Sequence, residues 1–379
     1  MKRIKLGINE IDLGEPLLWS VYGSNGQLLL RQGRIIDRQE VIDKVFQHDP
    51  MRNAEMIINS SHKERQRVTT VGASEQFNPF NEITRFATRY RNISRDIENQ
   101  NPFVNGKVLR LAEDIQSLVQ FDEDACLGAI HFYYDQTYTS LQPIYKAILC
   151  ELTAALLDYD AEQRLPLLAA AITSNIGLLD IQEKLNNQST PLSEEQKKAI
   201  ESAPAKAVEM LKTCNIDNTQ WLKCIIENHE RGDGSGYPWG LKSKHISPFA
   251  KILGIADCYV AMIARRAYRE PLLAQNALRT ISQMSSESDQ MIYRCFISQL
   301  GAFPPGTLVT LNNNEVAVVT YRGFGNSIMG AAMSIGNTDG SFYATPLRRD
   351  TSLEAFKIIK IYNPKTKPRL NPDRLWSYS

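Results

Sequence analysis

Histidine is scarce in this chain of 379 residues, which contains five. A hydrolytic centre of two or more transition metals normally takes several imidazoles and carboxylates from separate helices. His48 and His62 lie in a separate N-terminal region, and His245 follows a Lys-Ser-Lys run typical of a surface. His131 stands alone among aromatic residues, where packing is commoner than metal ligation. The composition therefore disfavours a complete multinuclear metal centre.

The chain also lacks the cysteine spacing of a zinc site, a strong net charge and a membrane-spanning run. Its six cysteines form no Cys-x-x-Cys pair, as expected of packed thiols in a cytoplasmic protein. The net charge of +1 gives no basis for binding nucleic acid or an anionic membrane surface. The longest apolar run, 165–172, is too short to span a bilayer, and no apolar core of a signal peptide follows the basic start. We expect a cytoplasmic protein with no membrane insertion and no nucleic-acid partner.

The first part of the chain, residues 1–60, is predicted to be a small module of a β-hairpin and a helix. Two apolar runs within residues 19–30 flank Asn25-Gly26, a strong hairpin turn signal. Asp37 and Glu40 have the spacing of a helix capping box. Residues 61–78 are polar and without a clear period, which is typical of a linker.

Residues 79–302 are predicted to be helical almost throughout, so the protein is expected to be mainly α. Phe86, Tyr90 and Ile93 keep helical spacing. Ser193 and Gln196 form a capping box, and Pro204 fits the first turn of a following helix. Residues 303–363 contain a second hairpin within 307–319 and further short strands near 328–335 and 342–346, which we interpret as a β-barrel-like module. Residues 364–379 are expected to be an extended tail.

The stretch 228–238 is the most informative part of the sequence. It reads Asn228, His229, Glu230, Arg231, Gly232, Asp233, Gly234, Ser235, Gly236, Tyr237 and Pro238. His229 closes an apolar helical stripe with Leu222, Ile225 and Ile226 and should point inward. The alternating glycines suit a backbone that passes close to another group, and Pro238 favours an extended residue before it.

This string resembles the signature of the HD-GYP family, cyclic di-GMP phosphodiesterases of bacteria, over about residues 140–300. The resemblance implies an all-helical HD-domain-like bundle, but most of the family's metal ligands are replaced. Thr173 and Ser174 stand at the His-Asp pair, Ala203 stands at a later His, and Asn228 stands at the first of two His residues; Gln142 stands at an upstream His. His229 and Asp257 are the ligand positions that survive.

Asp257 lies at the edge of the apolar face of a helix over residues 248–265. A carboxylate there is costly unless it is paired, hydrogen-bonded or bound to metal. We expect a partner on a neighbouring helix, with His229 as the candidate. Arg266 and Arg269 are three residues apart and share one side of a helix end, where they form either a solvated basic end or, as the resemblance implies, a contact with nucleotide phosphates.

The loop after His229 has two interpretations. Glu230, Arg231 and Asp233 are expected to pair locally and lock it. Tyr237 and Trp239 either pack over the domain's own core or present a protein-binding surface together with Gly234, Gly236 and Pro238. The resemblance links this loop to contacts with GGDEF-type diguanylate cyclase domains, which makes such a domain a candidate partner.

The sequence thus favours a regulatory sensor or scaffold in cyclic di-GMP signalling that binds without hydrolysis and needs no cofactor. One alternative is a phosphodiesterase with a reduced iron or manganese site at His229 and Asp257. The other is a protein-interaction module that binds no nucleotide.

Overall fold

The computed structural model describes most of the chain, and its described residues fall into two compact units. The described residues are 3–6, 20–24, 27–30, 36, 39–48, 50–53, 78–131, 138–264, 270–284, 289–322, 330–364, 368 and 370–378. The first unit comprises Met1–Gln76 and Gly323–Met329, and the second comprises Phe77–Arg322 and Gly330–Ser379. The predicted turn at Asn25-Gly26, the cap Asp37 and the linker up to residue 77 lie outside the described residues.

The first unit contains a small antiparallel sheet and one helix. Its strands are β1 (Arg3–Lys5), β2 (Val21–Tyr22), β3 (Leu28–Leu30) and β4 (Met51–Asn53), and its helix is α1 (Gln39–Phe46). The sheet order is β1-β4-β2-β3, and Val21 pairs with Leu30 across the hairpin as predicted. A small buried cluster that includes Val21, Leu29 and Val45 joins the sheet to α1.

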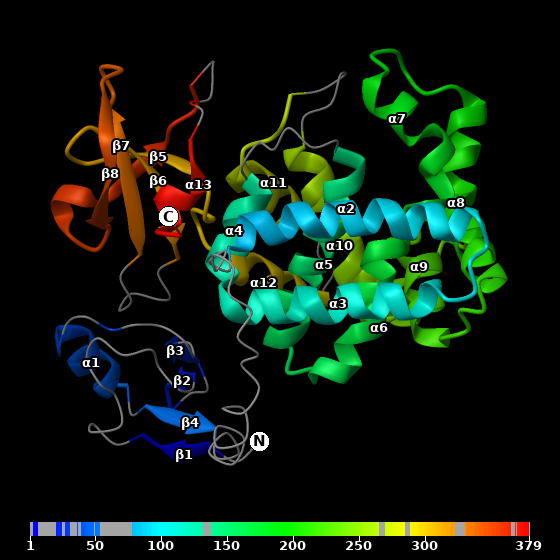
Figure 1. Ribbon diagram of the computed structural model, residues 1–379, viewed down its shortest axis with the longest axis horizontal. Helices are drawn as coiled ribbons and strands as arrows, with labels where there is room; N and C mark the ends of the chain where they lie inside the picture. Colours follow the sequence, from blue (N-terminus) through cyan, green and yellow to red (C-terminus); the bar gives the residue numbers. More distant parts are fainter. Residues whose placement is uncertain are drawn as a thin grey trace, which may run out of the picture. The chain divides into compact units, whose positions relative to one another are not determined.

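The second unit is mainly helical, as predicted (Figure 1). The described helices that precede its C-terminal sheet are α2 (Pro79–Glu98), α3 (Val104–Phe121), α4 (Glu123–His131), α5 (Tyr138–Leu156), α6 (Ala161–Thr173), η3 (Ile176–Leu178), α7 (Leu179–Asn187), α8 (Glu194–Thr213), α9 (Thr219–Glu227), η4 (Ser243–His245), α10 (Pro248–Ile263), α11 (Ala274–Gln283) and α12 (Gln290–Leu300). The predicted stripe residues Phe86, Tyr90 and Ile93 are buried on α2, within one hydrophobic core that most of these helices share.

The segment Ala161–Gln182 is long and apolar enough to cross a membrane by length and composition alone. It spans α6, η3 and the start of α7, and 61% of its most apolar window is buried inside the fold. Burial of this kind is typical of a core helix, because the apolar side chains already contact other helices. The α6 residues 167–173 are all buried.

The prediction that Pro204 begins a new helix is wrong, because it lies inside the continuous helix α8. The capping box that starts α8 is confirmed: Gln196 donates its backbone N–H to the Ser193 Oγ at 3.2 Å, and Ser193 donates to the Gln196 Oε1 at 2.9 Å. A proline inside a helix removes one backbone hydrogen bond. Burial of the surrounding helix face, with Ala207 and Leu211, offsets that loss.

The C-terminal strands form an open five-stranded sheet rather than the predicted barrel. They are β5 (Leu308–Leu311), β6 (Glu315–Tyr321), β7 (Ala331–Asn337), β8 (Phe342–Asp350) and β9 (Ile358–Ile361), with the short helix η7 (Glu354–Phe356) before β9. Their order is β8-β7-β6-β5-β9, so β8 and β9 are opposite edges that do not pair with each other. The predicted hairpin is confirmed in β5 and β6.

The expected extended tail contains a short helix, α13 (Pro372–Trp376), which joins the sheet to the helices. Leu375 packs in a cluster with Val316 and Val318 of β6. The Trp376 ring lies edge-on to Phe80 of α2, with 5.1 Å between ring centroids. The tail is therefore ordered by apolar contacts that the proline- and lysine-rich composition did not indicate.

Candidate functional site

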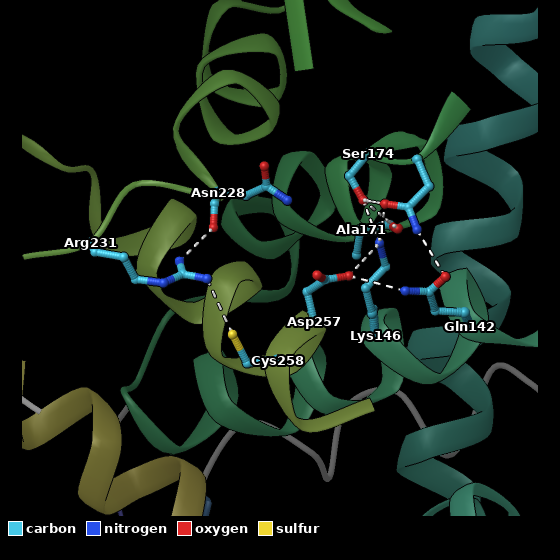
Figure 2. Close-up of polar contacts among 9 residues, drawn as sticks. Gln142, Lys146, Ala171, Ser174, Asn228, Arg231, Asp257 and Cys258 are labelled. Carbon is cyan, nitrogen blue, oxygen red and sulfur yellow. Dashed lines mark hydrogen bonds and ion pairs between the residues drawn. The ribbon is translucent and has the colours of Figure 1, made fainter. Parts of the chain in front are cut away.

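Polar side chains from three helices converge inside the helical bundle, and Figure 2 shows them pointing toward one another. Helix α5 supplies Gln142 and Lys146, the residues after α6 supply Ser174 and Asn175, and α10 supplies Asp257. Gln142, Ser174 and Asp257 are three of the positions at which the sequence resemblance places metal ligands. The fold therefore brings these positions together, although they are far apart in the sequence.

Lys146 lies at the centre of this cluster and is fully buried. Its Nζ donates to the Ser174 Oγ at 2.5 Å and the Asn175 Oδ1 at 3.1 Å, and lies 3.3 Å from the Asp257 Oδ1 (Figure 2). An ammonium group has three N–H donors. All three are used within the protein.

Asp257 has the partner on a neighbouring helix that its position required, but that partner is Lys146 and not His229. Gln142 also donates to the Asp257 Oδ1 at 3.2 Å, and accepts in turn from the Asn175 Nδ2 at 2.9 Å. Burial raises the pKa of Asp257, but Lys146, with smaller contributions from His229 and Arg231, outweighs burial and lowers it below its usual value. The carboxylate is thus held in its charged form.

Sequence reasoning missed Lys146, although the sequence contains a signal for it. The lysine interrupts the apolar run Ile144 to Cys150 and follows Gln142 by four residues, which places both on one side of α5. A charged residue on the buried face of a helix needs a counter-ion. Asp257, on another apolar helix, has the complementary need.

His229 lies just beyond the end of α9 and is half-buried. Its ring stacks on the Tyr237 ring, with centroids 4.8 Å apart and planes 20° apart. Burial lowers the pKa of His229 to about 4; Asp257 opposes this effect, and the cations Arg231 and Lys146 add to it. The imidazole is therefore neutral at neutral pH, with one ring nitrogen as a donor and the other as an acceptor.

The other candidate ligand positions do not join the cluster. The Thr173 Oγ1 donates to the carbonyl of Ala169 at 2.6 Å and accepts from the Trp221 Nε1 at 2.8 Å. Ala203 packs its backbone against Gly177, where an added Cβ would lie 2.2 Å from the Ala203 oxygen. Asn228 is 1% exposed, and its side-chain amide has no hydrogen-bond partner among the described residues.

The loop after His229 is locked locally, but through backbone amides. The Glu230 carboxylate accepts from the backbone N–H groups of Trp239 and Leu241, each at 2.7 Å. Asp233 accepts from the Ser235 N–H at 2.9 Å. In the part of the chain that the structure describes, no ion pair joins Arg231 to either acid. The expected pairing of these charges is wrong because the Arg231 guanidinium is directed to the Glu230 carbonyl and to Cys258.

Arg231 points to α10, where its Nη2 lies 3.3 Å from the Cys258 Sγ (Figure 2). Its Nη1 donates to the Glu230 carbonyl at 2.9 Å. Gly236 is required by close approach, since an added Cβ would lie 2.3 Å from the Arg231 nitrogen. Gly234 has a φ of 86°, which favours glycine. Gly236 is thus required by lack of space and Gly234 by its backbone conformation.

Tyr237 and Trp239, for which the sequence allows either packing over the core or a protein-binding surface, differ sharply in exposure. Tyr237 is half-buried against His229, and a cis peptide bond joins it to Pro238. Trp239 is 60% exposed. The structure therefore packs Tyr237 inward and leaves Trp239 as the aromatic residue that a partner protein would reach.

A cavity of about 460 Å³ opens beside the polar cluster. This volume falls within the range of small-molecule sites, roughly 300–1,000 Å³. Its polar lining comprises the side chains of Gln142, Asn175, Gln182, Gln188, Ser189, Thr190, His229, Tyr237 and Asp257. Lys146 and Ser174 do not line it. Arg266 and Arg269, the predicted phosphate contacts, lie outside the described residues.

The donors in this cluster do not fit a multinuclear metal centre. Among the residues that the structure describes, no group of three or more His, Cys, Asp or Glu side chains is placed to hold a metal ion. His229 and Asp257 supply one imidazole and one carboxylate, and Asp257 already pairs with Lys146. A second cation beside this ammonium group would meet repulsion from it.

Known proteins identify the class of this domain. Residues 129–291 match the HD domain family. A cyclic di-GMP phosphodiesterase of Pseudomonas aeruginosa is 26% identical over 213 residues, which are 55% of this chain and 50% of the relative. A cyclic di-GMP phosphodiesterase of Borreliella burgdorferi is 28% identical over 154 residues, 40% of each chain. Residues 129–291 of the helical part are thus similar to an HD domain.

The fold extends this similarity. A solved HDG"Y"P protein from Bdellovibrio bacteriovorus superimposes with a TM-score of 0.50 and 15% identity, over 78% of this chain and 98% of that chain. The resemblance to HD-GYP proteins found in the sequence thus holds in the fold. The chain spans half the length or less of these two curated relatives.

Proposed function

We propose that this HD domain is a regulatory module of cyclic di-GMP signalling that senses the nucleotide or scaffolds a complex without hydrolysing it. Both curated relatives described above are named for cyclic di-GMP, which supports the signalling system. The observation that carries the absence of hydrolysis is the Lys146 ammonium group at the centre of the converged ligand positions.

Metal-dependent hydrolysis needs a metal-bound water as its nucleophile. In this domain the charge that would balance Asp257 is already supplied by Lys146, at 3.3 Å. Ser174 offers a neutral hydroxyl, and Gln142 offers an amide, where carboxylate and imidazole ligands would be needed. The site is therefore complete as a hydrogen-bonded network of the chain's own groups.

A serine nucleophile is the strongest alternative, because Ser174 and Lys146 lie 2.5 Å apart and Ser-Lys pairs occur in hydrolases. Two observations oppose it. The Lys146 Nζ donates to the Ser174 Oγ and the Asn175 Oδ1 and pairs with Asp257, so it is engaged as a donor and does not accept the serine proton. Neither Ser174 nor Lys146 lines the cavity, and Ser174 is 4% exposed, so substrate would not reach the hydroxyl.

The test combines metal analysis, turnover and binding on the full chain. Protein purified without chelators is analysed for iron and manganese by mass spectrometry, and then incubated with cyclic di-GMP with and without added Mn²⁺ or Fe²⁺. The Pseudomonas aeruginosa relative serves as the positive control. We expect substoichiometric metal, no turnover, and binding of intact cyclic di-GMP by calorimetry.

Stoichiometric iron or manganese with metal-dependent turnover would establish the phosphodiesterase alternative. Metal-dependent turnover would thus overturn the proposed function. Absence of both turnover and binding would overturn nucleotide sensing and leave a module that acts through protein contacts alone.

A further inference from the structure

We infer that the cavity beside the polar cluster binds an uncharged nucleobase, and that the phosphates of a nucleotide ligand stay outside it. This inference rests on the proposed function and deepens it, since it assigns the cavity to the guanine base of cyclic di-GMP.

The described lining of the cavity offers no unpaired positive charge to a phosphate. Asp257 is the charged residue among the described lining side chains, and Lys146 neutralises it at 3.3 Å. A phosphate placed here would lose its hydration without gaining charged donors, whereas phosphates are normally held by cations or several N–H groups. A neutral heterocycle has no charge, so its transfer into the cavity does not remove the hydration of an ion.

Lys146 does not change this balance. Its three N–H groups are engaged by Ser174, Asn175 and Asp257, and it does not line the cavity. Contact between its ammonium group and a phosphate would require at least one of these buried interactions to break. An unpaired buried group costs more free energy than one exposed ion contact returns.

The cavity is also lined by hydrogen-bonding groups that lack partners among the described residues. His229 and Tyr237 line the cavity, and within the part of the chain that the structure describes neither the His229 ring nitrogens nor the Tyr237 hydroxyl forms a hydrogen bond. Gln182 donates its N–H to Asn186 at 3.1 Å and keeps its carbonyl oxygen unpaired. Together they offer donors and acceptors, which is the pattern of a base edge with adjacent N–H and C=O groups.

The aromatic and apolar parts of the lining suit the flat faces of a base. The stacked pair of His229 and Tyr237 forms one side, and Leu178, Leu185 and Leu192 contribute apolar surface. Sites that read a nucleobase combine aromatic or apolar contact with hydrogen bonds to its edge. The cavity has both kinds of contact within one enclosure.

The experiment uses guanosine, which has the base and no phosphate. Calorimetry measures its binding to the full-length wild-type chain, and cyclic di-GMP is then titrated in its presence and in the presence of inorganic phosphate. We expect guanosine to bind and to compete with cyclic di-GMP, and millimolar phosphate to leave both affinities unchanged at constant ionic strength.

Two conservative variants locate the contact. Gln182→Leu removes the unpaired carbonyl, and Tyr237→Phe removes the hydroxyl while keeping the stacked ring. Each should weaken guanosine binding about 3- to 10-fold, the effect of one hydrogen bond. Gln220→Leu, an exposed position on α9, is the matched control and should bind as the wild type does. Thermal melting verifies that each variant is folded.

The outcomes separate this inference from the proposed function. Binding of cyclic di-GMP without binding of guanosine, or competition by phosphate, overturns the inference and leaves the function standing. Binding of guanosine that both Gln182→Leu and Tyr237→Phe leave unchanged also overturns it. Binding of guanosine without binding of cyclic di-GMP supports the inference and overturns the proposed nucleotide.

Discussion

At the scale of single residues, the ion pair between Lys146 and Asp257 determines the character of the site. Replacing Lys146 by Met removes the cation and leaves the carboxylate without its counter-ion. Removing one partner of a buried pair costs about 3–5 kcal/mol. Because the Asp257 side chain is 16% exposed, we expect a loss near the lower end, about 3 kcal/mol, in urea unfolding.

Two further variants test whether that loss belongs to the pair. Lys146→Met combined with Asp257→Asn should be more stable than the sum of the single changes predicts, since neither charge is then left alone. Lys197→Met, which breaks an exposed pair with Glu194, should cost less than about 1 kcal/mol. Additive losses in the double variant would contradict the pairing.

Arg266 and Arg269 give a second prediction at this scale, which rests on the sequence alone. If the phosphates of cyclic di-GMP bind at these arginines, replacing either by Ala should weaken binding by about 1.5–3 kcal/mol, the range for hydrogen bonds to charged groups. Calorimetry measures the effect, and Arg279→Ala, at an exposed position on α11, is the control. Tight binding that survives the double replacement would place the phosphates elsewhere.

The site shows what single-residue reasoning reaches and where it ends. The need of Asp257 for a partner follows from its apolar surroundings, which the sequence displays. The identity of that partner depends on how α5 is rotated against α10, and this is set by packing across the whole bundle. The prediction that His229 is the partner of Asp257 is therefore wrong. The partner is Lys146, which lies within an apolar run of α5.

At the scale of elements, the loop over residues 228–243 places Tyr237 and Trp239 in different surroundings, which the sequence does not distinguish. Tyr237 stacks on His229, so Tyr237→Ala should destabilise the fold by about 1–3 kcal/mol. Trp239 is 60% exposed, so Trp239→Ala should change stability by less than about 0.5 kcal/mol. Thermal and urea unfolding of the two variants measure the difference.

Capture of a GGDEF-type domain by the same variants tests the partner surface. Loss of capture by the stable variant Trp239→Ala would place partner binding on this loop. Unchanged capture, or a large loss of stability in that variant, would contradict the assignment of Trp239 to a protein-binding surface.

The C-terminal sheet contains a second charged pair, and it gives a pH prediction. Glu315 on β6 accepts two hydrogen bonds from the Arg349 guanidinium of β8, at 2.7 and 2.8 Å. These bonds lower the pKa of Glu315 to about 2. A carboxyl whose folded pKa is lowered stabilises the fold above its unfolded pKa, and this contribution is lost as the pH falls toward the folded value.

We therefore expect Glu315 to contribute a loss of about 1 kcal/mol per pH unit as the pH falls from about 4 to 2.5. Urea unfolding of the wild type and of Glu315→Gln across this interval isolates the contribution as a difference in slope. Equal slopes for the two proteins would show that the pair does not hold the carboxylate in its charged form.

Elements were predicted well wherever local signals and packing agree. The capping box at Ser193 and the hairpin of β5 and β6 depend on residues adjacent in sequence, and both are confirmed. Pro204 was misread because its local preference for a first turn is overridden by burial of the surrounding helix face. Closure of the C-terminal strands was misjudged because strand order is not encoded in any single strand.

At the scale of the second unit, α13 and Arg322 join the C-terminal sheet to the helices. Arg322 is buried and pairs with Glu123 and Asp124 at the start of α4, and it also donates to the carbonyl of Gln299. Trp376 packs near Gly128, where an added Cβ would lie 2.4 Å from the indole. The sheet and the bundle are therefore expected to unfold together.

Trp376→Ala tests this coupling. Truncating a buried tryptophan costs about 3–5 kcal/mol, and the partial burial of Trp376 places the expected loss near about 3 kcal/mol. Circular dichroism in urea should show one transition shifted to lower denaturant, with Trp239→Ala as the exposed tryptophan control. Two separate transitions in the wild type would show that the sheet and the helices are independent.

The fully buried Lys146 has a consequence for the life of the protein in the cell. On the proposed function, the positive charge beside Asp257 belongs to a side chain of the protein itself. The site therefore needs no metal ion to be inserted after translation, and it contains no metal ion that could be oxidised. Iron starvation or oxidative stress would then inactivate phosphodiesterases that depend on a bound metal ion, whereas ligand binding by this domain would be unchanged. A chelator added to the cells would change the output of the former and not the occupancy of the latter.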